Sequence, residues 1–203
     1  MKLYFHYYPW GYSNCYILGT DSPSNDAIII DPGNVDSNLI SLIEDNNYTL
    51  RGVLITHDHA HHVRGLKTIM RVYDTTIYAI NPMVMEYRCT HVKDGDTIDI
   101  GPFRAEVIAV PGHSADSAVY KIDRLLFTGD TPNAGFVGST ASSYAALNQI
   151  NALRGKLLSL PGDYTILPGH GPPSSLEVER RLNLGLKSFE EQKKNRPVIR
   201  FEF

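Results

Sequence analysis

The sequence predicts a single α/β domain. In the first third of the chain, short apolar runs alternate with segments of helical periodicity, which is typical of βα units. Further along, alternating runs separated by Gly and Pro turns predict hairpins. At 203 residues the chain is long enough for one domain with a sizeable core. We therefore expect one domain over residues 1–203, with a short C-terminal extension at about 187–203.

The first third of the chain is expected to form strands joined by helices. Strands are predicted at residues 2–8, 15–18, 27–30 and 52–56. Apolar residues at helical spacing predict a helix from Asp36 to Asn46, with Asp36 or Ser37 as its N-cap. Another helix is expected to begin at the end of the 52–56 strand and to run to Tyr73.

The rest of the chain is predicted to contain more strands and two more helices. The strands are expected at 76–79, 97–100, 103–110, 117–122, 125–128 and 165–167, and residues 82–87 are expected to be a short helix or loop. A helix over 143–158 would turn four residues inward, namely Leu147, Ile150, Leu153 and Leu157. Ser174 and Glu177 have capping-box spacing and are expected to open the last helix.

A histidine cluster follows the strand at 52–56. Four of the eight histidines lie within six residues, in the segment His57-Asp58-His59-Ala60-His61-His62. The side chains of His57 and His59 alternate along extended backbone and point to one side, whereas His61 and His62 lie where a helix begins. Two directions of approach indicate two metal ions. The alternative is a solvated, histidine-rich turn.

Three further strands also end in side chains that bind metals. Each predicted strand is followed by a tight turn that contains glycine, and these turns carry His113, Asp130 and His170. A strand end holds a ligand more rigidly than a long loop does. The sequence therefore predicts a metal site where these strand ends meet.

Composition excludes several other functions. The formal net charge is -3 and no run of Lys and Arg is longer than a pair, so neither a nucleic-acid groove nor a membrane surface is indicated. A small-molecule substrate is expected instead. Cys15 and Cys89 form no CxxC motif, the N-terminus is too polar for a signal peptide, and no apolar run is long enough for a membrane helix. These features favour a cytoplasmic protein.

The order of these motifs resembles that of the metallo-β-lactamase superfamily. The family pattern is His-x-His-x-Asp-His, a later Pro-Gly-His turn, a Gly-Asp after a strand and a final Gly-His, and it is matched in order between about Asn14 and Glu179. The resemblance implies a four-layer αββα sandwich with a metal centre at one edge of its two sheets. Within the superfamily, the segments Ile30-Asp31-Pro32-Gly33 and Pro168-Gly169-His170-Gly171-Pro172 look most like those of glyoxalase II-like hydrolases.

The resemblance also implies a role for each ligand. It assigns His57, His59 and His113 to a first metal, and His62 and His170 to a second. Asp130 would bridge the two ions.

Two positions depart from the family pattern. Residue 61 is an aspartate in the family and a histidine here. If His61 is a ligand, the site becomes rich in nitrogen, which favours zinc over manganese or calcium; if it points away, the second site is weak or vacant. Asp116 stands where the family usually has glycine, and we expect its side chain on the surface.

The expected function is hydrolysis. Two divalent ions, expected to be zinc, would share a hydroxide that attacks a thioester, ester or lactone carbonyl. Asp130 is the expected catalytic carboxylate, and Asp58 and Asp31 are candidates to orient the imidazoles. Asp58 is otherwise a solvated residue.

Two other functions remain open. One is a mononuclear iron enzyme of the persulfide dioxygenase kind, in which His57, His113 and Asp130 would hold the ion. The other is a non-catalytic metal-binding sensor on the same fold.

Substrate recognition and assembly are less determined by the sequence. Tyr144, Arg154 and Lys156 are candidates to line the mouth of the site or to lie on a helix surface. Residues 198–203 alternate apolar and polar side chains. They are expected to form an edge strand of the protein's own sheet or to pair with a second subunit in a homodimer.

Overall fold

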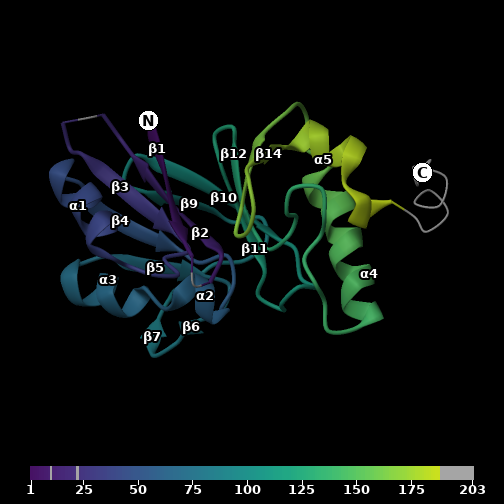
Figure 1. Ribbon diagram of the computed structural model, residues 1–203, viewed down its shortest axis with the longest axis horizontal. Coiled ribbons are helices and arrows are strands. Elements are labelled where there is room, and N and C mark those ends of the chain that lie inside the picture. The colour runs from purple at the N-terminus through teal and green to yellow at the C-terminus, as the bar shows by residue number, and fades with distance from the viewer. Residues whose placement is uncertain (10, 22, 188–203) are drawn as a thin grey trace, which may run out of the picture.

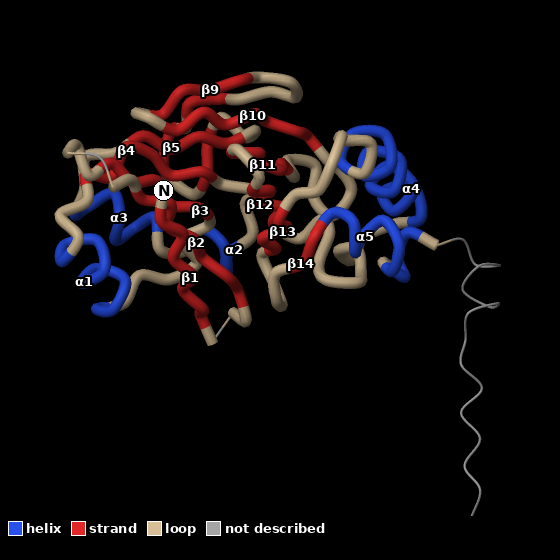
Figure 2. Tube along the Cα trace, turned by 90° about the horizontal axis from the view of Figure 1, so that it is seen from above, coloured by secondary structure: helices blue, strands red, loops and turns tan. Residues whose placement is uncertain are grey.

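The computed structural model describes residues 1–9, 11–21 and 23–187, which fold into four layers. Two six-stranded sheets pack face to face, and helices cover the outer face of each. In Figures 1 and 2, α1 (Ser37–Asp45) and α3 (Leu66–Val72) lie on one side of the strands, and α4 (Ser143–Ala152) and α5 (Leu176–Leu182) lie on the other. The predicted αββα sandwich is confirmed.

The first sheet is built from the N-terminal half of the chain. Its strands, in spatial order, are β1 (Lys2–Tyr8), β2 (Ser13–Gly19), β3 (Asp26–Ile30), β4 (Thr49–Leu54), β5 (Thr76–Ala79) and β8 (Thr90–His91). β3, β4, β5 and β8 pair in parallel, with α1 crossing between β3 and β4, and α2 (Ala60–Val63) and α3 crossing between β4 and β5. Parallel neighbours end at the same edge of a sheet. The segments after β3 and β4 therefore lie side by side.

The second sheet is built from the C-terminal half. Its strands, in spatial order, are β14 (Ser174–Ser175), β13 (Thr165–Pro168), β12 (Leu125–Gly129), β11 (Ala118–Ile122), β10 (Phe103–Ala109) and β9 (Thr97–Ile100). β12 and β13 are parallel, and β10 and β12 are each antiparallel to β11 between them. The carboxyl ends of β10, β12 and β13 thus meet at one edge.

Three apolar layers hold the sandwich together. One lies between α1, α3 and the first sheet, a second between the two sheets, and a third between the second sheet and its helices. The run Ile28-Ile29-Ile30 shows why the end of β3 is apolar at every position: Ile29 faces the helices and its two neighbours face the second sheet. A strand buried on both faces needs apolar residues at every position.

The sheets are joined at the edge where the predicted ligands lie. The Ala118 N–H donates to the Thr56 carbonyl at 2.8 Å, and the Asn14 N–H donates to the Gly169 carbonyl at 2.8 Å. These backbone hydrogen bonds place the end of β4 against β11 and the end of β13 against β2.

Most predicted elements are present, but the helix after the histidine cluster is divided. α2 ends at Val63 and α3 begins at Leu66, with Gly65 between them. The Gly65 N–H donates to the Pro32 carbonyl at 2.7 Å, and a Cβ added at Gly65 would lie 2.3 Å from that oxygen. The close approach of the β3 turn interrupts the helix.

Three local predictions were wrong. Residues 82–87 contain part of a small ribbon, β6 (Met83–Val84) and β7 (Tyr87–Arg88), and no helix. The last helix is capped by Ser175, which accepts from the Val178 N–H, and Ser174 instead pairs with Ile166 in the sheet. Leu147 is 55% exposed.

The exposure of Leu147 follows from its place on the helix. Leu147 and Leu153 lie six residues apart, and at 3.6 residues per turn this spacing puts them on different faces. Leu153 and Leu157 are buried as predicted. They belong to η1 (Leu153–Leu157), a π-helical turn that continues α4 and in which the Leu158 N–H donates to the Leu153 carbonyl.

Two further expectations concern the C-terminus and membranes. The predicted strand at 198–203, and with it the proposed dimer contact, lies outside the described residues. Among the described helices, none is long and apolar enough to cross a membrane.

Candidate metal centre

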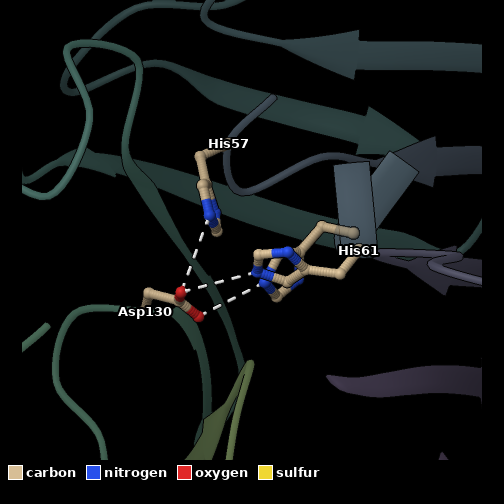
Figure 3. A group of neighbouring side chains, drawn as sticks. His57, His61 and Asp130 are labelled. Atoms are coloured by element: carbon tan, nitrogen blue, oxygen red, sulfur yellow. Dashed lines mark ion pairs between the residues drawn. The ribbon is translucent and has the colours of Figure 1, made fainter. Parts of the chain in front are cut away.

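The predicted ligands meet at the edge where the two sheets join. His57 follows β4, His113 follows β10, Asp130 follows β12, and His170 follows β13. Figure 3 shows the rings of His57 and His61 directed at the carboxylate of Asp130. Residues from both halves of the chain therefore surround a single carboxylate.

We define the first cluster as His57, His59 and His113. His59 Nδ1 lies 3.0 Å from His57 Nε2 and 3.1 Å from His113 Nε2. His113 Nε2 and His57 Nε2 lie 3.3 and 3.8 Å from Asp130 Oδ2. Three imidazole nitrogens thus converge beside one carboxylate oxygen.

We define the second cluster as His61, His62 and His170. The Nε2 atoms of His61 and His170 lie 3.9 and 3.5 Å from Asp130 Oδ2, and that of His62 lies 3.3 Å from Oδ1. The ring centroids of His61 and His170 are 4.9 Å apart. Of the two orientations that the sequence left open, His61 adopts the one that faces the other histidines.

Two hydrogen bonds and one ion-pair contact, on the sides of the rings away from Asp130, orient three of the histidines. His113 Nδ1 donates to the Ser139 carbonyl at 2.8 Å, and His170 Nδ1 donates to the Tyr12 carbonyl at 2.6 Å. His62 Nδ1 lies 3.2 Å from Asp31 Oδ2. With a proton on Nδ1, the Nε2 lone pairs of His113 and His170 are available toward Asp130.

Asp31 is itself held firmly. Its Oδ1 accepts from the Thr56 N–H at 2.8 Å and its Oδ2 accepts from the Thr56 hydroxyl at 2.6 Å. Thr56 directly precedes His57, so the carboxylate that contacts His62 also holds the residue before His57. Asp31 thereby connects the two clusters.

The electrostatics keep imidazoles neutral and the carboxylate charged. Burial, reinforced by the neighbouring His62, lowers the pKa of His57 to about 2. Burial alone would raise the pKa of Asp130, but contact with His61 and His62 lowers it well below its usual range. Neutral imidazoles and an ionised carboxylate are the forms that bind metals.

His62 differs from His57. Burial lowers its pKa, but Asp130 and Asp31 on either side more than offset this and raise it to about 9. Without a bound cation, His62 is therefore an imidazolium at neutral pH.

The buried polar atoms at the centre fit a metal site. His61 Nε2, His62 Nε2 and Asp130 Oδ1 are buried and have no hydrogen-bond partner among the described atoms. Leaving such a group unpaired costs about 1–3 kcal/mol, and more when it is charged. A divalent ion would satisfy these atoms together.

Two groups of four ligand atoms each lie within 4.8 Å of one another. One contains His57, His59, His113 and Asp130, and the other contains His57, His61, His62 and Asp130. His170 stands slightly outside the second group, although its Nε2 is 3.5 Å from Asp130 Oδ2. We assign His57 to the first cluster because its Nε2 is closest to His59. The donor set thus fits two ions that share Asp130.

Of the two remaining acidic residues, Asp116 contradicts its prediction and Asp58 does not. Asp116, expected on the surface, is only 8% exposed and accepts from the Asp58 N–H at 2.9 Å and from the Asn81 side-chain amide at 3.0 Å. The surface prediction was wrong because the turn after His113 folds against the His57–His59 segment. The side chain of Asp58 is exposed, and its predicted role in orienting an imidazole stays a prediction.

Sequence reasoning did not predict that the backbone carbonyls of Ser139 and Tyr12 would orient His113 and His170. Any residue type supplies a backbone carbonyl, so no signal in the sequence could have found them. Thr56 carried a weak signal, since a hydroxyl residue lies between the apolar strand and the first histidine.

A hollow of about 360 Å³ opens beside the first cluster. It is lined by Pro111, Gly112, His113, Ser114, Ala115, Ala141, Tyr144, Ala145 and Asn148. Tyr144 therefore lies at the mouth. Arg154 donates instead to the Leu186 carbonyl, and Lys156 binds Asp94 and the Ala109 carbonyl, so both secure the helix surface.

The fold and the centre together define a metallo-β-lactamase-type protein with a histidine and aspartate metal site. The model of the metallo-β-lactamase superfamily matches residues 8–170, and the chain belongs to this family.

Its similarity to known proteins extends to sequence and structure. The chain is 33% identical over 168 residues to a protein of Hahella chejuensis named hydroxyacylglutathione hydrolase; the match covers 78% of this chain and 62% of that protein. The chain thus spans less than two thirds of this relative.

Two solved structures have the same fold. ETHE1 from Myxococcus xanthus matches with a TM-score of 0.83 and 25% identity, over 98% of this chain and 93% of that one. The B3 metallo-β-lactamase BLEG-1 matches with a TM-score of 0.81 and 23% identity, over 92% of this chain and 100% of that one.

Proposed function

We propose that this protein is a metal-dependent hydrolase that acts on a thioester, ester or lactone carbonyl, with chemistry like that of glyoxalase II. The observation that carries the proposal is the convergence of five imidazoles on the buried carboxylate of Asp130, with His59 in contact with two of them. A divalent ion held there supplies an activated water and polarises a carbonyl oxygen.

The chain's own residues prepare the site for hydrolysis. Asp130 presents Oδ2 to the first cluster and Oδ1 to His62, so one carboxylate serves both sets of imidazoles. In the reaction, the oxygen of water bonds to the carbonyl carbon, the carbon–sulfur bond of a thioester breaks, and the departing thiolate takes the proton. A thiolate leaves readily and needs little help from a general acid, which suits a site whose histidines are grouped as metal ligands around Asp130.

We propose zinc as the metal. Six nitrogen donors and one carboxylate favour zinc over manganese, magnesium or calcium, which prefer oxygen. The replacement of the family's aspartate by His61 strengthens this preference, because it removes an oxygen donor.

The similarity to a hydroxyacylglutathione hydrolase supports the reaction class. The chain spans 62% of that relative, so the substrate is a separate question. We also propose a cytoplasmic location, which the free thiols of Cys15 and Cys89 support.

Metal analysis combined with a hydrolysis assay tests the proposal. The protein purified without added metal is expected to contain zinc by mass spectrometry, and to hydrolyse simple thioesters. Removal of zinc by a chelator should abolish turnover, and zinc should restore it. A zinc-replete protein that hydrolyses no thioester, ester or lactone would contradict the proposal.

A mononuclear iron enzyme of the persulfide dioxygenase kind is the second candidate. It is supported by the positions of His57 and His113, whose Nε2 atoms approach the same oxygen of Asp130 and so offer two histidines and one carboxylate to a single ion. Iron in place of zinc, with oxygen consumption when a persulfide is added, would favour this function over hydrolysis. A protein that binds metal but catalyses neither reaction would favour a sensor.

A further inference from the structure

The wall of the site beside His113 carries no charge. Residues 131–153, which follow Asp130 and include α4, contain no Lys, Arg, Asp, Glu or His. Apart from His113, the residues that line the hollow are also uncharged. An anionic part of a substrate would find no cation here, and placing a charge without a partner in such a site is unfavourable.

The hollow adjoins the metal centre. His113 belongs to both, because its Nε2 lies 3.1 Å from His59 Nδ1 and 3.3 Å from Asp130 Oδ2 while the residue also lines the hollow. A substrate whose carbonyl reaches the metal centre could therefore place an adjacent group in the hollow. The volume of about 360 Å³ lies at the small end of the range for small-molecule sites.

One side of the hollow is rigid and the other is adjustable. Gly112 packs tightly against α4, since a Cβ added there would lie 2.4 Å from Gln149 Cβ and 2.6 Å from the Ala145 carbonyl. Tyr144, by contrast, is 74% exposed and presents its ring at the mouth. An aromatic ring in this position can cover an apolar chain at little cost in conformational entropy.

We propose that this hollow is the subsite for the acyl group of the substrate, and that it selects an uncharged hydrocarbon chain which packs against Tyr144. The inference rests on the proposed hydrolase function. Of the two halves of a thioester, the acyl half is the one that can be a plain hydrocarbon. Thiol carriers bear amides, carboxylates or phosphates, which the uncharged wall does not match.

The first test is the dependence of kcat/KM on acyl length. With zinc-loaded protein and thioesters of N-acetylcysteamine, kcat/KM should rise from acetyl to butyryl to hexanoyl, by about tenfold overall. A succinyl thioester, which ends in a carboxylate, should be hydrolysed at least about tenfold less efficiently than the butyryl thioester.

Variants then test whether residues of the hollow cause the dependence of kcat/KM on the acyl group. Tyr144→Ala should lower the hexanoyl-to-acetyl ratio of kcat/KM about tenfold. Leu147→Ala is the matched control, because Leu147 is an exposed side chain of the same helix that does not line the hollow, and the ratio should not change. Ala141→Arg places a cation in the hollow and should raise the succinyl-to-butyryl ratio.

Binding separates this inference from the proposed function. The probe is a ketone analogue of hexanoyl-N-acetylcysteamine in which a methylene replaces sulfur, titrated calorimetrically into zinc-loaded protein. The wild type and Leu147→Ala should bind it about tenfold more tightly than Tyr144→Ala.

The results distinguish the proposed hydrolase function from the proposed acyl subsite. If no thioester, ester or lactone is hydrolysed but binding follows this order, the proposed function fails and the subsite stands. If thioesters are hydrolysed but acyl length and Tyr144→Ala have no effect, the subsite is overturned and the function stands. Equal binding of the ketone by all three proteins also overturns the subsite.

Discussion

The two histidine clusters differ in packing although they share one carboxylate. In the first cluster, His59 Nδ1 lies 3.0 and 3.1 Å from its two neighbours. In the second, two of the three side chains, His61 and His170, are 35% and 27% exposed. The first cluster is therefore a compact, preorganised set of donors, and the second is more open to solvent. We expect the first cluster to bind a metal ion more tightly, and the second cluster to exchange its ion with solution more readily.

The largest effect is expected from the carboxylate that the clusters share. Among the described residues, Asp130 is the one carboxylate that both clusters contact, so in Asp130→Asn metal content should fall at both sites and activity should drop on the order of a thousandfold. The measurements are kcat/KM and metal content after dialysis. Asp123→Asn, at an exposed turn, is the matched control and should match the wild type. Near-wild-type activity in Asp130→Asn would refute the metal assignment.

Next in size is the contrast between one histidine from each cluster. His57→Ala opens the compact cluster and should lower kcat/KM by at least about a hundredfold, whereas His61→Ala should lower it only about tenfold. His91→Ala, at an exposed histidine on β8, should leave activity unchanged. A larger loss in His61→Ala than in His57→Ala would reverse the comparison.

The clusters should also differ in how pH affects metal binding. His62 has a pKa raised to about 9, so below that pH a proton must leave before it can bind a metal. Affinity at the second cluster should therefore rise about tenfold per pH unit between pH 7 and 8, and level off above about 9. His57, with its pKa lowered to about 2, is already neutral and adds no such dependence. Zinc titrations at several pH values measure this, and identical pH slopes for both ions would contradict it.

The smallest expected effect comes from restoring the family residue. His61→Asp adds a second carboxylate beside two divalent ions, so the second ion should bind about tenfold more tightly. Calorimetric titration with zinc measures the change, and His91→Asp serves as the control for an added surface carboxylate. Unchanged affinity would mean that His61 is already an adequate ligand.

Much of the fold follows from local patterns. The sequence predicted β3, β5, β9 and β12 to within a few residues. For β3 and β12 the signal is a continuous apolar run, because nearly every position of these strands is buried. Predictions were wrong where a distant segment intervened. Gly65 interrupts a helix because Pro32 approaches it, and Ser174 is drawn into a strand beside Ile166.

The histidine cluster shows what the sequence by itself determined. The positions of His57, His59, His61 and His62 at a strand end follow from the apolar run before them, and the matching strand ends of His113, Asp130 and His170 follow in the same way. Only the tertiary structure decided that His61 faces its neighbours, that Asp31 contacts His62, and that Asp116 is buried beneath the His57–His59 segment. The physical reason is that strand formation depends on adjacent residues, whereas these contacts depend on how two sheets from different halves of the chain meet at one edge.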